Sequence, residues 1–178
     1  MEKKVPHDPN EILAVVNDKD EVIGEDKRSE IHKNELIHRE ICVFIINEKE
    51  EVLLQKRKDL NIWDASCSGH FPKEQNYVSA AKREVEEELG ITLDEKDFTQ
   101  IDFRLFKAKH RVTGKINTRF TKAFIVRKNI NLNEINFDKE ELSEVRYFNK
   151  SELKTLVLSK ENNLSTYTKF FIENYLIK

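Results

Sequence analysis

The sequence has 178 residues and a mass of 21.1 kDa, which fits a single domain, residues 1–178, around one hydrophobic core. Its 31 Lys and Arg residues nearly balance 33 Asp and Glu residues, for a formal net charge of −2. This balance excludes a global basic field, so neither nucleic acid nor a membrane surface is an expected partner. The two cysteines are too few for a disulfide framework in a small secreted chain, and a cytoplasmic location is expected.

Short strands joined by polar turns are predicted first. Alternating apolar residues predict two hairpins, one over residues 12–16 and 21–25 and one over residues 41–46 and 52–57. The stretch between these hairpins, residues 26–39, is polar and carries His32 and His38. No period holds from residue 59 to residue 76, and a loop of this length in a compact domain is often functional.

A helix over residues 77–89 follows this loop. Val78, Ala81, Val85 and Leu89 recur at helical spacing, and Gly90 stands where a left-handed C-cap would fall. The later elements expected are strands over 100–109, 116–128 and 144–148, a turn at 112–115, a helix beginning at Ser151 and an amphipathic helix over 165–176. Together they predict an α/β (α+β) fold with a mixed or antiparallel sheet, preceded by a flexible N-terminal segment, residues 1–9.

Three glutamates share one face of the predicted helix. Glu84, Glu87 and Glu88 are spaced i, i+3 and i+4, so they fall on an arc of about 100°. Like charges this close repel unless a cation lies among them. Clustered oxygen ligands suit Mg²⁺ or Mn²⁺, which take phosphate oxygens as further ligands. The pattern favours a metal site for a phosphorylated substrate; the alternative is a solvated helix face in which Lys82 and Arg83 pair with the glutamates.

The segment around this helix resembles the signature of Nudix hydrolases. Gly69 is followed at the family's spacing by Arg83-Glu84-Val85-Glu86-Glu87-Glu88-Leu89-Gly90-Ile91, and eight of the nine specified positions match. The departure is Gln75, where the family has its first glutamate. The resemblance covers residues 10–178 and implies the Nudix-type α/β/α sandwich with a mixed sheet and the signature loop and helix.

The resemblance also implies an activity. Family members hydrolyse a nucleoside diphosphate linked to a moiety X, through attack of a metal-activated water on phosphorus. By this resemblance Glu84, Glu87 and Glu88 ligate Mg²⁺ or Mn²⁺, the backbone carbonyl of Gly69 is a further ligand, and Arg83 orients the carboxylates. A general base is expected at Glu87 or among the carboxylates of residues 138–141, with Glu141 favoured.

Substrate contacts are implied for three further residues. Arg57 resembles the arginine that touches substrate phosphate, although a surface arginine on an edge strand is an equal alternative. His70 follows Gly69 at the mouth of the predicted site. Trp63 would stack on a base or isoprenoid group, or else anchor the loop in the core.

A narrower resemblance, to isopentenyl-diphosphate isomerases, lies in residues 62–70 together with His32 and His38. In that family three histidines and a glutamate hold a metal; ordinary hydrogen bonding is the alternative for His32 and His38. The isomerase cysteine aligns with Ser68, and Cys67 is displaced by one residue, which turns its thiol the other way.

Partner glutamates of the isomerase are also missing, because Asn117 and Arg119 stand in their place. The chain therefore resembles an isomerase-like branch of Nudix hydrolases. An isomerase, or a non-catalytic module that binds a nucleotide or a partner, is the alternative. The expected partner is a small-molecule diphosphate substrate; the identity of X and the oligomeric state stay open, with a homodimer as one candidate.

Overall fold

The computed structural model describes residues 8–109, 114–159, 161 and 163–177. Its elements, in chain order, are β1 Ile12–Val16, β2 Val22–Lys27, α1 Arg28–Lys33, β3 His38–Ile46, β4 Val52–Arg57, β5 Ile62–Asp64, β6 Cys67–His70, α2 Tyr77–Leu89, η1 Glu95–Asp97, β7 Phe98–Lys109, β8 Ile116–Arg127, η2 Leu132–Glu134, β9 Leu142–Phe148, α3 Lys150–Leu158, α4 Thr166–Phe171 and η3 Ile172–Leu176. Among the described residues, none of the helices combines the length and apolar character needed to cross a bilayer.

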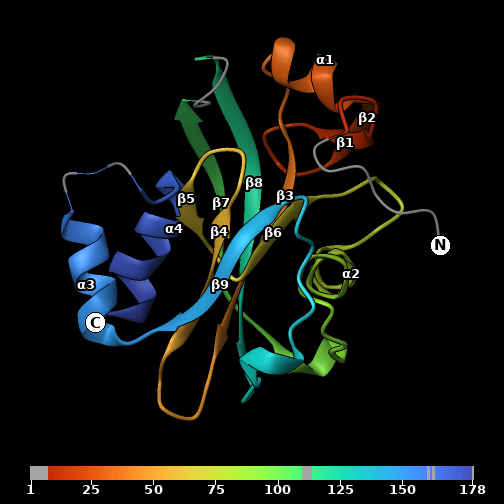
Figure 1. Cartoon of the computed structure of the whole chain (residues 1–178). Helices are drawn as coiled ribbons and strands as arrows, with labels where there is room; N and C mark the ends of the chain where they lie inside the picture. Colours follow the sequence, from red (N-terminus) through yellow and green to blue (C-terminus); the bar gives the residue numbers. More distant parts are fainter. Residues whose placement is uncertain (1–7, 110–113, 160, 162, 178) are drawn as a thin grey trace.

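Nine strands of the described chain form one mixed sheet built around β3 (Figure 1). β3 runs parallel to β8 along its whole length, with His38 opposite Arg119. It is antiparallel to β1, β4 and β6, and the β6 pairing places Glu40 opposite His70. The mixed sheet that the sequence predicts is confirmed.

Helices cover both faces of this sheet, with α2 on one side and α3 and α4 on the other (Figure 1). Because side chains of a strand alternate between faces, β3 contributes to two cores. Ile41 and Val43 lie in the core that contains Val85 of α2, whereas Phe44 lies in the core that contains Phe171 of α4. The predicted α/β/α layering is therefore confirmed.

Several predicted elements are confirmed with their boundaries. β1, β4 and α2 span the residues expected of them. Asn76 caps α2 in a capping box with Ser79, and Gly90 ends it with φ of 68° in the left-handed region. The helix expected at Ser151 begins at Lys150, and the predicted 165–176 helix is α4 capped by Ser165 and continued by the π-helical η3.

Two predictions need correction, and two lie largely outside the described residues. The segment 59–76 contains β5 and β6 as well as loop; strands of three and four residues are too short to show an alternating pattern. The polar stretch 26–39 contains α1, whose only buried residue is Ile31. The described structure leaves out residues 110–113 of the predicted turn region and residues 1–7 of the predicted N-terminal segment.

Candidate active site

Helix α2 presents two of the three predicted metal-binding glutamates to the sheet. Glu84 and Glu88 are 1% and 6% exposed, whereas Glu87 is exposed to solvent. The buried face of α2 also carries Ala81, Val85 and Leu89, so apolar packing fixes the direction in which Glu84 and Glu88 point. The carboxylate of Glu84 lies so close to Gly69 of β6 that a Cβ on residue 69 would be 2.5 Å from Oε1 of Glu84.

Arg83 contacts the residues that the sequence expects it to orient. Its guanidinium lies 2.7 Å from Oε1 of Glu84 and 2.7 Å from Oε2 of Glu87. Nε of Arg83 donates to Oε1 of Gln75 at 3.2 Å, and a terminal nitrogen donates to the backbone carbonyl of His70 at 3.3 Å. One arginine thus links the glutamate face, the loop before α2 and β6.

Glu88 lies among acidic and polar neighbours. Burial first, and then the carboxylates of Glu84 and Glu141, raise the pKa of Glu88 well above its usual range, while hydrogen bonds from Gln55 and Cys67 act in the opposite direction. Glu141 reaches this cluster because its loop is tied at two points: Asp138 N–H donates to the carbonyl of Glu88, and Lys58 N–H donates to the carbonyl of Glu141. A divalent cation would stabilise the charged form of a carboxylate crowded in this way.

A cavity of about 360 Å³ joins these carboxylates to other predicted site residues. The predicted residues among those that line it are Arg57, Gly69, His70, Glu84, Glu88 and Glu141. Arg57 contacts Asp59 through Nε at 3.1 Å and a terminal nitrogen at 2.7 Å. Arg83 and Glu87 lie outside the lining; Glu87 is exposed and Arg83 is partly buried.

Trp63 does not lie where a substrate-binding role would require it. It does not line the cavity, and its ring instead packs edge-to-face against Phe148 with centroids 4.7 Å apart, beside the core under α3 and α4. Successive side chains of β5 point to opposite faces of the strand, so the side chain of Trp63 points away from that of Asp64 and away from the cavity. The structure thus agrees with the core alternative.

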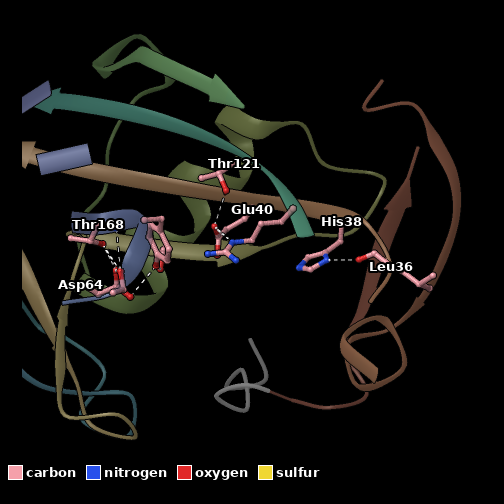
Figure 2. A network of polar contacts seen from close by, with 10 residues as sticks. Leu36, His38, Glu40, Asp64, Thr121 and Thr168 are labelled. Atoms are coloured by element: carbon pink, nitrogen blue, oxygen red, sulfur yellow. Dashed lines mark hydrogen bonds and ion pairs between the residues drawn. The ribbon is translucent and has the colours of Figure 1, made fainter. Parts of the chain in front are cut away.

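His32, His38 and His70 form a cluster, and His32 and His70 line the same cavity. One ring nitrogen of each lies within 4.8 Å of those of the other two. Nδ1 of His38 is hydrogen-bonded to the carbonyl of Leu36 at 3.1 Å, as Figure 2 shows, which leaves Nε2 as an acceptor. Burial lowers the pKa of His38 to about 3 and the pKa of His70 well below its usual value. Within the described chain, Nε2 of His38 and Nε2 of His70 have no hydrogen-bond partner. Neutral, inward-facing imidazoles of this kind fit a metal ion.

A buried ion pair lies beside the histidines and was missed by sequence reasoning. Oε2 of Glu40 accepts from Nε of Arg119 at 2.5 Å and from the hydroxyl of Thr121 at 3.0 Å (Figure 2). Arg119 and Glu40 are 5% and 6% exposed. The signal that could have found Glu40 is its position two residues after His38 at the start of an apolar strand, which places both side chains on one face.

Asp64 is the centre of a second missed network. Its Oδ1 accepts from the N–H of Ala65 at 2.8 Å and from the hydroxyls of Ser165 and Thr168 at 2.8 and 2.5 Å, and its Oδ2 accepts from the hydroxyl of Tyr167 at 2.9 Å. Figure 2 shows Asp64 facing Thr168 of α4. No short-range pattern in the sequence predicts a contact between residues about a hundred positions apart.

Ser68 and Cys67 take the opposite orientations that the sequence predicts. Ser68 lines the cavity, and its hydroxyl is 2.9 Å from the hydroxyl of Tyr167. Cys67 is fully buried in the core under α2, where its thiol hydrogen-bonds to Glu88. The cavity therefore contains the serine hydroxyl, and the neighbouring cysteine does not line it.

Comparisons with known proteins agree with this geometry. A family model described as the NUDIX domain matches residues 36–169. An uncharacterised Nudix hydrolase of Listeria monocytogenes is 34% identical over 130 residues, which are 70% of this chain and 71% of that protein. Isopentenyl-diphosphate Delta-isomerase 1 of Mus musculus is 29% identical over 194 residues, covering 94% of this chain and 83% of the isomerase. The crystal structure of DR0079 from Deinococcus radiodurans superposes with a TM-score of 0.68 at 19% identity, covering 93% of this chain and 99% of that one.

Proposed function

The chain belongs to the Nudix family, and on this premise we propose that it is a Mg²⁺- or Mn²⁺-dependent pyrophosphohydrolase. Its substrate would be a nucleoside diphosphate linked to a moiety X, or another organic diphosphate. The observation that carries the proposal is the convergence of Glu84, Glu88 and Glu141 in one cavity, with Gly69 in contact with Glu84. A buried carboxylate such as Glu88, whose pKa is raised by burial and by the carboxylates of Glu84 and Glu141, favours a bound cation.

The metal would be held by the glutamate face. Glu84 and Glu88 offer buried oxygens, and within the described residues Oε2 of Glu88 has no hydrogen-bond partner. The carbonyl of Gly69 would be a further ligand, and Glu87 would join once Arg83 releases it. A cation bound there supplies charge neutralisation on phosphate and a lowered pKa of water.

The chain's own side chains would then bind substrate and move a proton. Glu141 lines the cavity beside Glu88, and we assign it as the general base that accepts the proton of the attacking water. Arg57 also lines the cavity, and it would anchor a phosphate by exchanging part of its contact with Asp59. His70 would contact the substrate next to Gly69.

The histidine cluster would hold a second ion. His32, His38 and His70 supply three imidazole nitrogens around one point, and the lowered pKa of His38 and of His70 keeps each as a ligand rather than a cation. This ion would lie in the same cavity as the glutamates, because His32 and His70 line it.

An isomerase is the second candidate, and the similarity to the mouse enzyme over most of the chain favours it. Isomerisation needs an acid and a base on opposite faces of the allyl unit. In this cavity Ser68 replaces the cysteine, and Arg119 is a cation paired with Glu40. A non-catalytic binding module is the third candidate, which the intact glutamate face disfavours. The balance of these observations supports hydrolysis.

A phosphate-release screen tests the proposal. The unchanged chain is incubated with Mg²⁺ and with nucleotide sugars, dinucleoside polyphosphates, nucleoside triphosphates, thiamin diphosphate and isoprenoid diphosphates. We expect hydrolysis of at least one, lost with chelator, and a kcat lowered by at least about 10² in Glu88→Gln. Glu86→Gln is the matched control, because Glu86 is exposed and outside the cavity lining. Metal-independent hydrolysis, or full activity of Glu88→Gln, would contradict the proposal. A cytoplasmic location and a homodimer stay predictions.

A further inference from the structure

A small recess opens beside the main cavity, between the glutamate cluster and β6. Its volume is about 20 Å³, and it is lined by Gln55, Arg57, Ser68, Glu88, Glu141 and Leu142. A space of this size accommodates one water molecule and no larger ligand, provided that polar partners surround it. The lining meets this condition, because five of the six residues are polar.

One buried acceptor in this lining is unpartnered and has no role in holding the proposed cation. Oε1 of Gln55 has no hydrogen-bond partner in the part of the chain that the structure describes, and Gln55 is only 2% exposed. The Gln55 side chain hydrogen-bonds to Glu88; an amide can do so only through its N–H₂, which leaves its oxygen as an acceptor. Unpaired buried acceptors are costly, so the site calls for a molecule that brings hydrogen-bond donors.

The Ser68 hydroxyl is a second acceptor, and its direction follows from a count of protons. Asp64 receives hydrogen bonds from one backbone N–H and three hydroxyls, so it acts only as an acceptor. The single proton of the Tyr167 hydroxyl is therefore directed to Asp64. The 2.9 Å contact between Tyr167 and Ser68 must then use the hydrogen of Ser68. Both lone pairs of Ser68 are left for the recess.

We propose that this recess holds the water that attacks phosphorus, and that Ser68 and Gln55 are positioning residues for it. This inference rests on the proposed hydrolase function. One hydrogen of the water is directed to the neutral acceptors Ser68 and Gln55, which fix its orientation and cannot take its proton. The other is directed to Glu141. As the water oxygen forms a bond to phosphorus, the bond from phosphorus to the bridging oxygen breaks, the leaving phosphate takes that electron pair, and Glu141 receives the proton.

Variants of Ser68 and Tyr167, whose hydroxyls are in contact, test this inference with the substrate that the screen finds to be hydrolysed fastest. We expect Ser68→Ala to lower kcat roughly tenfold, the loss of about one hydrogen bond in the transition state. The KM and the Mn²⁺ affinity measured without substrate should stay within about twofold. Ser68→Thr, which keeps the hydroxyl, should restore most of the rate.

A double-mutant cycle separates a positioning role from a structural one. Tyr167→Phe alone should lower kcat about threefold, because Ser68 is then free to turn its hydrogen into the recess, and it should cost nothing more in the Ser68→Ala background. Ser66→Ala is the matched control. Its hydroxyl, two residues away, bonds to the backbone of Leu53 and Ile45, so it should lower the melting temperature and leave kcat unchanged.

The outcomes distinguish the positioning role of Ser68 and Gln55 from the proposed hydrolase function on which it rests. No hydrolysis by the unchanged chain would overturn both. Hydrolysis by the unchanged chain with full activity of Ser68→Ala would overturn the positioning role alone. A large loss of Mn²⁺ affinity in Ser68→Ala would make Ser68 a metal ligand and would also overturn it. Strictly additive effects of Ser68→Ala and Tyr167→Phe on kcat would contradict the claim that Tyr167 acts by orienting the Ser68 hydroxyl.

Discussion

Replacing Gly69 by alanine should disable the glutamate face without touching a glutamate. The new Cβ would lie 2.5 Å from Oε1 and 2.8 Å from Oε2 of Glu84, whereas ordinary contact begins at 3.4 Å. The carboxylate must therefore retreat by about 1 Å, a displacement that can cost on the order of 10² in rate when it affects a reacting group. Arg83 holds the Glu84 carboxylate beside Gly69, so a retreat into the cavity that Glu84 lines moves its oxygens away from the proposed metal position.

The assay measures binding and turnover separately. In Gly69→Ala we expect Mn²⁺ affinity, followed by isothermal titration, and kcat/KM to fall about 10²-fold. Overpacking should also lower the unfolding free energy by about 1–3 kcal/mol, which is about 2–4 °C in melting temperature for each kcal/mol. Gly24→Ala is the matched control, since nothing lies within 4 Å of the Cβ it would add. A folded Gly69→Ala protein with wild-type Mn²⁺ affinity would refute the placement of Glu84 as a ligand.

Three further predictions concern the contact between Gln75 and Arg83, the alternative isomerase reaction, and the buried ion pair of Glu40 with Arg119. Gln75→Glu should raise the melting temperature by about 1–3 °C, because a charged partner replaces the amide that Arg83 contacts at a partly exposed site; a large gain in kcat or a loss of folding would place position 75 in the catalytic shell. Incubation in D₂O should introduce no deuterium into isopentenyl or dimethylallyl diphosphate; exchange that Cys67→Ala abolishes would show that the cysteine reaches the substrate. Arg119→Met should destabilise the protein by about 3–5 kcal/mol, because it leaves the buried carboxylate of Glu40 uncompensated; replacing both residues by methionine should recover most of that loss, and a cost below about 1 kcal/mol in urea unfolding would contradict the pairing.

Sequence reasoning found the parts of the fold that local patterns encode. The helix α2 is bounded by Asn76 and Gly90, two residues with strong capping preferences, and its apolar residues keep one period. β5 and β6 were not predicted, because their strand conformation comes from pairing with β4 and β3 respectively and not from their own three or four residues. Short strands of this kind are defined by tertiary contacts, which no local pattern reports.

The same distinction applies to the candidate site. A spaced motif that runs from β6 through one loop into α2 predicts that Gly69, Glu84 and Glu88 belong to one site, and their role as metal ligands stays a prediction. The contact of Asp64 with Tyr167 spans 103 residues, and that of Glu40 with Arg119 spans 79, so neither leaves a local signal. Trp63 shows the converse limit: its residue type suggests stacking on a ligand, but only its packing against Phe148 reveals its place.

The parallel pairing of β3 with β8 has a consequence for the order in which the protein folds. Gly69 and Glu84 are 15 positions apart and can meet early, whereas Arg119 pairs with His38 only after a loop of about eighty residues has closed. Closing such a loop costs entropy before the contact stabilises anything, so non-local parallel strands form slowly. During refolding, α2 and Gly69 should therefore come together before His38 of β3 pairs with Arg119 of β8. Catalysis should return only with the last kinetic phase, later than the recovery of helical circular dichroism.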